Sequence, residues 1–176
     1  MPGSSPSYAC RFRDLDTIVD EVHALFAGWA RAGTFAETLD ASGIFVAQLA
    51  VHEWVANLVQ HAAFGGRAVE IDLSLTVEAG GLRCVIEDNS DGFDFEEQVD
   101  RQERLVQAPE PSERGRGLLM LIACAEDLRY ESAGRGRQRI AFVVPASLPP
   151  ERLLSLFPPD HLRGDAAQPQ PAGPTS

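Results

Sequence analysis

Three polar residues recur at a fixed interval within one largely apolar segment. Glu53, Asn57 and His61 stand at positions i, i+4 and i+8. In an α-helix each member of such a series is rotated by about 40° from the one before, so all three share one face. A carboxylate, an amide and an imidazole on one stripe could serve as a base, a metal ligand and an orienting group. A solvated polar helix face is the alternative that the spacing leaves open.

A second polar run follows a strand-like segment. It reads Ile86-Glu87-Asp88-Asn89-Ser90-Asp91-Gly92-Phe93-Asp94. A carboxylate fixed at a strand end, such as Asp88, can accept hydrogen bonds from the exocyclic amine of a base. Gly92 would let the backbone approach a ligand closely. Because Asp, Asn, Ser and Gly all favour turns, an acidic surface turn is the alternative interpretation.

A third motif is a glycine-rich turn that opens a helix. It reads Glu113-Arg114-Gly115-Arg116-Gly117-Leu118-Leu119-Met120. The free backbone N–H groups and partial positive charge of a helix N-terminus favour a bound anion, and Arg114 and Arg116 add positive charge. The alternative is the end of a flexible loop with a glycine N-cap.

The hydrophobic pattern predicts a strand and two helices ahead of these motifs. Tyr8, Cys10 and Phe12 alternate with their neighbours, which indicates a short strand, and Asp14 could cap the helix that follows. An apolar stripe at helical spacing defines this first helix, which Gly33 is expected to end: Leu15, Ile18, Val19, Val22, Leu25, Phe26 and Trp29. A second helix, from about Ala41 to Ala63 and closed by Gly65-Gly66, carries the first motif.

The remaining pattern predicts two β-hairpins around a long irregular segment. Strict alternation over 68–77 predicts a strand with one buried face, and residues 78–81 turn into a second strand over 82–87. Residues 88–116 hold no sustained period apart from a short helix near 96–107, and a loop of that length is usually functional or disordered. A helical pattern returns over 118–125, and 128–144 form a closing hairpin.

Composition indicates one acidic globular domain. The 176 residues contain 15 Lys+Arg and 26 Asp+Glu, giving a net charge of −11. Such a surface repels phosphate backbones, so general binding to nucleic acid or to an anionic membrane is disfavoured, although a local basic pocket for a small anion is compatible with it. We expect a disordered lead-in at 1–7, a domain over 8–145, and a Pro-rich tail over 146–176, with a short apolar segment at Leu153–Phe157 that docks and disorder from Gly164 onward.

The cysteines and the N-terminus favour a cytoplasmic protein. Cys10, Cys84 and Cys124 are odd in number and widely spaced, which argues against a disulfide framework. No apolar run approaches the roughly 20 residues that span a bilayer, and the first residues lack the regions of a signal peptide.

The order of the three motifs is more specific than any one of them. It resembles the ATP-binding domain of histidine kinases and gyrase, known as the GHKL or Bergerat fold. Glu53, Asn57 and His61 match its N-box, 88–94 match its first glycine box, and Gly115 to Leu118 match its second, with the intervening segment in the place of the ATP lid. The resemblance implies an α+β fold: a two-layer α/β sandwich with a mixed, mostly antiparallel sheet and helices packed on one face.

Within that superfamily the chain looks most like the bacterial anti-sigma factor serine kinases. The ATPase domain stands almost alone, Gly92-Phe93-Asp94 follow the box, and the lid is short. A full histidine kinase would be expected to carry a dimerisation hairpin upstream, and gyrase relatives a further catalytic domain.

This resemblance implies a role for each motif. Asn57 would coordinate Mg²⁺, Glu53 would act as general base or orient the attacking hydroxyl, and Asp88 would hold the adenine amino group beside Gly92. His61 would lie at the nucleotide, although it could equally be a packing or capping residue. The phosphates would be cradled by the second box, which comprises Arg114, Gly115, Arg116, Gly117 and Leu118.

The implied reaction transfers the γ-phosphoryl group of ATP to a serine or threonine of an anti-anti-sigma protein of the STAS type. A sigma factor or an equivalent regulator is a second implied partner, and a homodimer is compatible with the family. No direct contact with nucleic acid or membrane is expected.

One position departs from the usual D-x-G-x-G box. Ser90 stands where its first glycine is expected, and if that position needs a positive φ, serine would cost about 1–2 kcal/mol. The alternative function is therefore a weak or inactive adaptor of the same fold that sequesters protein partners. A third reading, an ATPase subunit that reshapes something larger, would need a transducer domain.

Overall fold

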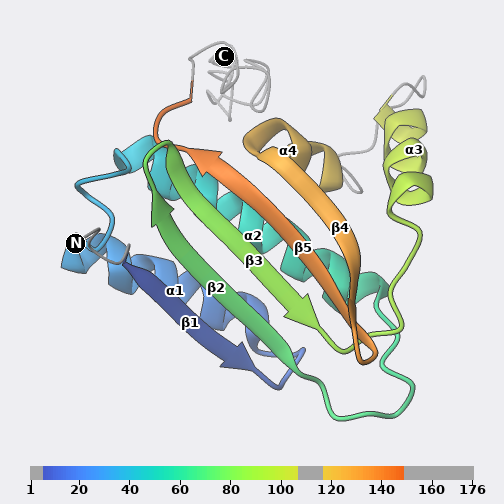
Figure 1. Cartoon of the computed structure of the whole chain (residues 1–176). Coiled ribbons are helices and arrows are strands. Elements are labelled where there is room, and N and C mark those ends of the chain that lie inside the picture. The colour runs from blue at the N-terminus through green and yellow to red at the C-terminus, as the bar shows by residue number, and fades with distance from the viewer. Residues whose placement is uncertain (1–5, 107–116, 149–176) are drawn as a thin grey trace, which may run out of the picture.

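The computed structural model describes residues 6–106 and 117–148, which form two layers. Figure 1 shows a twisted sheet with helices α1, α2 and α4 behind it, and α3 beyond the β4 edge. The elements in chain order are β1 (Ser7–Phe12), α1 (Ile18–Ala32), α2 (Ala41–His61), β2 (Ile71–Glu78), β3 (Gly81–Asp88), α3 (Phe95–Val106), α4 (Gly117–Cys124), β4 (Glu126–Gly134) and β5 (Arg137–Pro145). The α+β class and the two-layer architecture are confirmed.

The sheet has the strand order β1-β2-β3-β5-β4, and each neighbouring pair in it is antiparallel rather than mixed. Alternation places one row of each strand against the helices. On β3 the inward row is Leu82, Cys84 and Ile86, all fully buried. Asp88 ends this same row, so the strand delivers a carboxylate to the helix-covered side of the sheet.

Helix α2 runs through the middle of the helical layer, between α1 and α4. Asp40 caps it, because its Oδ1 accepts a hydrogen bond from Gly43 N–H at 2.7 Å. The helix ends at His61, two residues earlier than expected, because Ala62 is already extended while its N–H still donates to Leu58 O. Burial from Gly43 to Leu58 fixes α2 in the core.

Two boundaries differ from the sequence prediction because side chains replace regular backbone bonds. Asp14 does not cap α1: its Oδ1 accepts from Asp16 N–H at 2.9 Å in a turn, and the helix begins at Ile18. The strand predicted from 68 begins at Ile71. Asn89 takes the place of a strand partner there, accepting from Glu70 N–H at 2.9 Å and donating to Ala68 O at 2.8 Å.

The predicted end of α1 is confirmed. Gly33 ends α1 in the left-handed conformation at φ 65°. The three cysteines are free thiols. Within 6–106 and 117–148, no helix has the length and apolar character that crossing a bilayer requires. The expected disordered lead-in at 1–7 is too long, because Ser7 begins β1 and pairs with Thr76 of β2. Residues 1–5, the apolar segment Leu153–Phe157 and the rest of the tail after 148 lie outside the described residues.

Candidate functional site

Two of the three predicted helix residues form a compact polar pair on α2. Asn57 is only 8% exposed, and its Nδ2 donates to the backbone oxygen of Glu53 at 2.7 Å. This bond occupies the amide nitrogen and leaves the carbonyl oxygen as the atom suited to a cation. Glu53 is half-buried, and this burial raises the pKa of its carboxyl group. His61, one turn after Asn57, is exposed at the last residue of the helix.

The N-terminus of α4 meets this pair. A Cβ added at Gly117 would fall closer to Glu53 Oε2 than real Cβ atoms allow, and 3.5 Å from Asn57 Nδ2. Glycine is therefore the residue that lets the helix start against the carboxylate. Gly117 and the buried Leu118 are the described part of the second predicted box. Arg114, Gly115 and Arg116 lie outside the described residues.

Asp88 carries an unsatisfied acceptor inside the protein. The residue is 1% exposed, and its Oδ1 accepts from Ser90 N–H at 2.9 Å. Its Oδ2 is buried and has no hydrogen-bond partner among the described residues. A buried polar atom without a partner costs free energy, so such an atom indicates a place for a ligand donor. The amino group of a purine has the required chemistry.

The turn after Asp88 is held in one conformation. Asp91 N–H donates to Ala63 O at 2.8 Å, and the Asp91 carboxylate pairs with Arg67. Gly92 has φ 78°, and a Cβ there would lie 2.9 Å from the side-chain carbon Cδ of Gln138. The positive φ favours glycine at this position, whereas the Gln138 side chain could move aside for a Cβ.

Ser90 fits this turn without backbone strain. Within the described residues, the non-glycine residues at positive φ are Asp127 and Arg135, so Ser90 avoids the left-handed region. Its side chain is buried, and its Oγ accepts from Gly92 N–H at 3.2 Å. The positive φ that would have made serine costly is absent, and the hydroxyl instead caps the turn.

Gln102 is a residue of this site that motif reasoning missed. It lies on α3, is 5% exposed, and its Oε1 accepts from the backbone N–H groups of Leu118 at 2.9 Å and Leu119 at 3.4 Å. It therefore caps α4 from another helix. A signal was present: Phe95, Val99 and Gln102 follow helical spacing, which places the glutamine on the inward stripe of α3.

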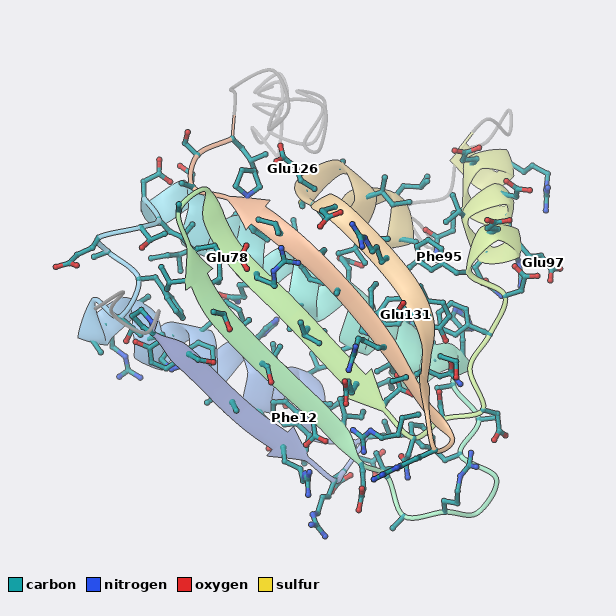
Figure 2. All side chains as sticks on the ribbon, in the orientation of Figure 1. Phe12, Glu78, Phe95, Glu97, Glu126 and Glu131 are labelled. Atoms are coloured by element: carbon teal, nitrogen blue, oxygen red, sulfur yellow. The ribbon has the colours of Figure 1, made fainter. Side chains whose placement is uncertain are left out.

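An aromatic cluster, also missed, connects the segments that carry the site. It comprises Trp54, Phe93, Phe95 and Tyr130. Phe93 and Tyr130 stack with ring centroids 5.3 Å apart, and the Tyr130 hydroxyl accepts from Phe93 N–H at 3.4 Å. Figure 2 shows Phe95 on the side of α3 that faces β4, whereas Glu97 points away. The cluster thus packs α2, the turn, α3 and β4 together around the position next to Glu53.

A comparison with protein-family models identifies a family for most of the chain. Residues 13–142 match the family model of the histidine kinase-like ATPase domain. That range includes Glu53, Asn57, Asp88 and Gly117. No curated protein matches the chain.

Proposed function

The chain belongs to the histidine kinase-like ATPase family, and on that premise we propose that it is an anti-sigma-factor-type serine/threonine protein kinase. Membership in this family makes it an ATP-binding domain of the GHKL type. The observation that carries the proposal is the contact of Glu53 and Asn57 with the start of α4, on the side of the sheet where an oxygen of Asp88 has no hydrogen-bond partner within residues 6–106 and 117–148.

The residues present fit a magnesium nucleotide. Asp88 Oδ2 would accept a hydrogen bond from the adenine amino group, and the α4 N-terminus would receive phosphate oxygens. Asn57 would offer its carbonyl oxygen to Mg²⁺. The described residues contain no cluster of three or more His, Cys, Asp or Glu side chains that could hold a metal. This suits Mg²⁺, which in phosphoryl-transfer sites takes few protein ligands and neutralises charge on the phosphate oxygens.

The proposed chemistry gives Glu53 the proton. A serine or threonine hydroxyl oxygen of the partner forms the new bond to the γ-phosphorus of ATP, the bond from that phosphorus to the bridging oxygen breaks, and ADP leaves. The hydroxyl proton passes to the Glu53 carboxylate. Because burial raises the pKa of Glu53, its carboxylate is a stronger base than an exposed one.

The proposed partners follow from the same family reasoning. The substrate is an anti-anti-sigma protein of the STAS type, and a sigma factor or equivalent regulator binds the kinase in a partner-switching cycle in the cytoplasm. A homodimer is the oligomeric state to test.

Phosphoryl transfer from labelled ATP to a STAS protein in the presence of Mg²⁺ tests the proposal. Glu53→Ala should abolish transfer and keep nucleotide binding, whereas Asn57→Ala should also weaken binding of the magnesium nucleotide. Gln60→Ala, on the same helix and exposed, is the matched control and should transfer normally. Transfer by the Glu53 variant would remove Glu53 as the base. No transfer by the wild type while partner binding persists would replace the kinase by the adaptor.

A further inference from the structure

Gln102 occupies backbone donors that a phosphate would need. Helix α4 begins at Gly117, so the N–H groups of Leu118 and Leu119 belong to the first turn and have no partner within the helix. Gln102 Oε1 accepts from both, at 2.9 and 3.4 Å. The contact is nearly inaccessible to water, since Gln102 is 5% exposed and Leu118 is fully buried.

The same donors lie beside the polar pair of α2. Gly117, their neighbour, leaves no room for a side chain against the Glu53 carboxylate. Independently of this helix start, the buried Oδ2 of Asp88 at the end of β3 has no hydrogen-bond partner among the described residues, which points to a ligand donor there. A phosphate brought to Glu53 and Asn57 would therefore arrive at amides that already have an acceptor.

We propose that Gln102 is an internal competitor for the phosphate-binding amides of α4, and that it sets affinity for polyphosphates. The inference rests on the proposed function for its natural ligand, ATP. A phosphate oxygen and Gln102 Oε1 require the same N–H hydrogens, so binding of one displaces the other. A charged phosphate forms stronger hydrogen bonds than the neutral glutamine amide and therefore displaces it. The wild type nevertheless binds phosphate more weakly than a variant whose α4 amides have no such acceptor.

Two variants of Gln102 should move affinity in opposite directions. Gln102→Ala removes the competitor, so affinity for ATP and for inorganic tripolyphosphate should rise about tenfold, as expected for releasing two amide donors. Gln102→Glu keeps an acceptor at the amides and adds a negative charge, so both ligands should bind about tenfold or more weakly. Adenosine, which has no phosphate, should bind all variants equally.

Calorimetric titration of each variant with ATP, adenosine and tripolyphosphate provides the test. Gln98→Ala is the matched control, because Gln98 lies one turn earlier on α3 and is partly buried. Melting temperature without ligand shows that each variant folds, and the Glu variant should melt no lower than the wild type.

The outcomes separate this inference from the proposed function. Weaker or unchanged binding of tripolyphosphate by Gln102→Ala would overturn it, as would a failure of both the wild type and Gln102→Ala to bind any polyphosphate. If neither ATP nor adenosine binds but tripolyphosphate binds the Ala variant tenfold more tightly, the nucleotide function fails and the role of Gln102 stands.

Discussion

Replacing Gly117 by alanine tests whether phosphoryl transfer depends on the exact position of the Glu53 carboxylate. The added Cβ would fall within 3.0 Å of Glu53 Oε2, whereas ordinary contact begins at 3.4 Å. The nearest atom is the end of a flexible side chain, so the carboxylate moves and the helix stays. It must retreat by more than 0.4 Å, the difference between these limits.

The expected loss follows from the sensitivity of catalysis to position. General bases contribute about 10²–10⁴ in rate, and a misplacement of about 1 Å can cost about 10². We therefore expect phosphoryl transfer by Gly117→Ala to fall about 10²-fold, or about 2.7 kcal/mol in the barrier. Stability should change little, because Gly117 is the first residue of α4 and the advantage of alanine over glycine, about 0.5–1 kcal/mol, applies to a helix interior.

Transfer rates at saturating ATP and the melting temperature together decide the result. Gly28→Ala is the matched control: it is also a helical glycine, and nothing lies within 4 Å of its added Cβ. It should stabilise the protein and leave transfer unchanged. A Gly117 variant with wild-type transfer would refute the assignment of Glu53 as the positioned base, and one that fails to fold would refute the inferred movement of its carboxylate.

Three further predictions concern Asp88, Ser90 and His52. Asp88→Asn should weaken ATP binding about 10–100-fold by calorimetry, because one neutral NH₂ replaces a charged acceptor; equal affinity would remove adenine from this pocket. Ser90→Gly should lower the free energy of unfolding by about 0.5–1 kcal/mol in denaturant, because the hydrogen bond to Gly92 N–H is lost, and should not increase affinity for ATP. Tighter ATP binding by this variant would indicate that glycine is the better residue at position 90. Burial lowers the pKa of His52, and the neighbouring His23 lowers it further, with His23 Nε2 3.0 Å from His52 Nδ1. The unfolded chain therefore binds the proton at a higher pH than the folded chain does, and the free energy of unfolding should fall as pH drops below about 6.5. In melting curves from pH 8 to 5, His52→Gln should flatten this slope while the exposed His61→Gln keeps it, and parallel slopes in wild type and His52→Gln would contradict the assignment.

The elements of the fold could be predicted because burial imposes their periods. Strands β2 and β3 bury one face, so alternation located both of them, although β3 extends one residue beyond the predicted 82–87 and ends at Asp88. The starts of α1 and β2 could not be located in this way. They depend on hydrogen bonds of the side chains of Asp14 and Asn89, and the Asn89 bonds connect residues about 20 positions apart.

The site divides along the same physical line. Spacing on one helix was enough to bring Glu53 and Asn57 together, because an α-helix fixes their separation. The hydrogen bond between Gln102 of α3 and Leu118 of α4 joins residues 16 positions apart on different helices, so only the fold reveals it. Ser90 shows the reverse error: the motif made the residue a source of strain, but strain depends on φ, which a motif does not report.

A ligand would form its hydrogen bonds at different cost at Asp88 and at the start of α4. At Asp88 an adenine amine would satisfy an oxygen that has no hydrogen-bond partner in the described part of the chain, so binding there displaces none of the described contacts. At α4 a phosphate would form hydrogen bonds only after Gln102 gives up its own. The base should therefore contribute a larger share of affinity than its single carboxylate contact suggests, and the phosphates a smaller share than their charge suggests. On this reasoning the affinity of the wild type for adenosine is close to its affinity for ATP, and the difference between the two affinities increases in Gln102→Ala.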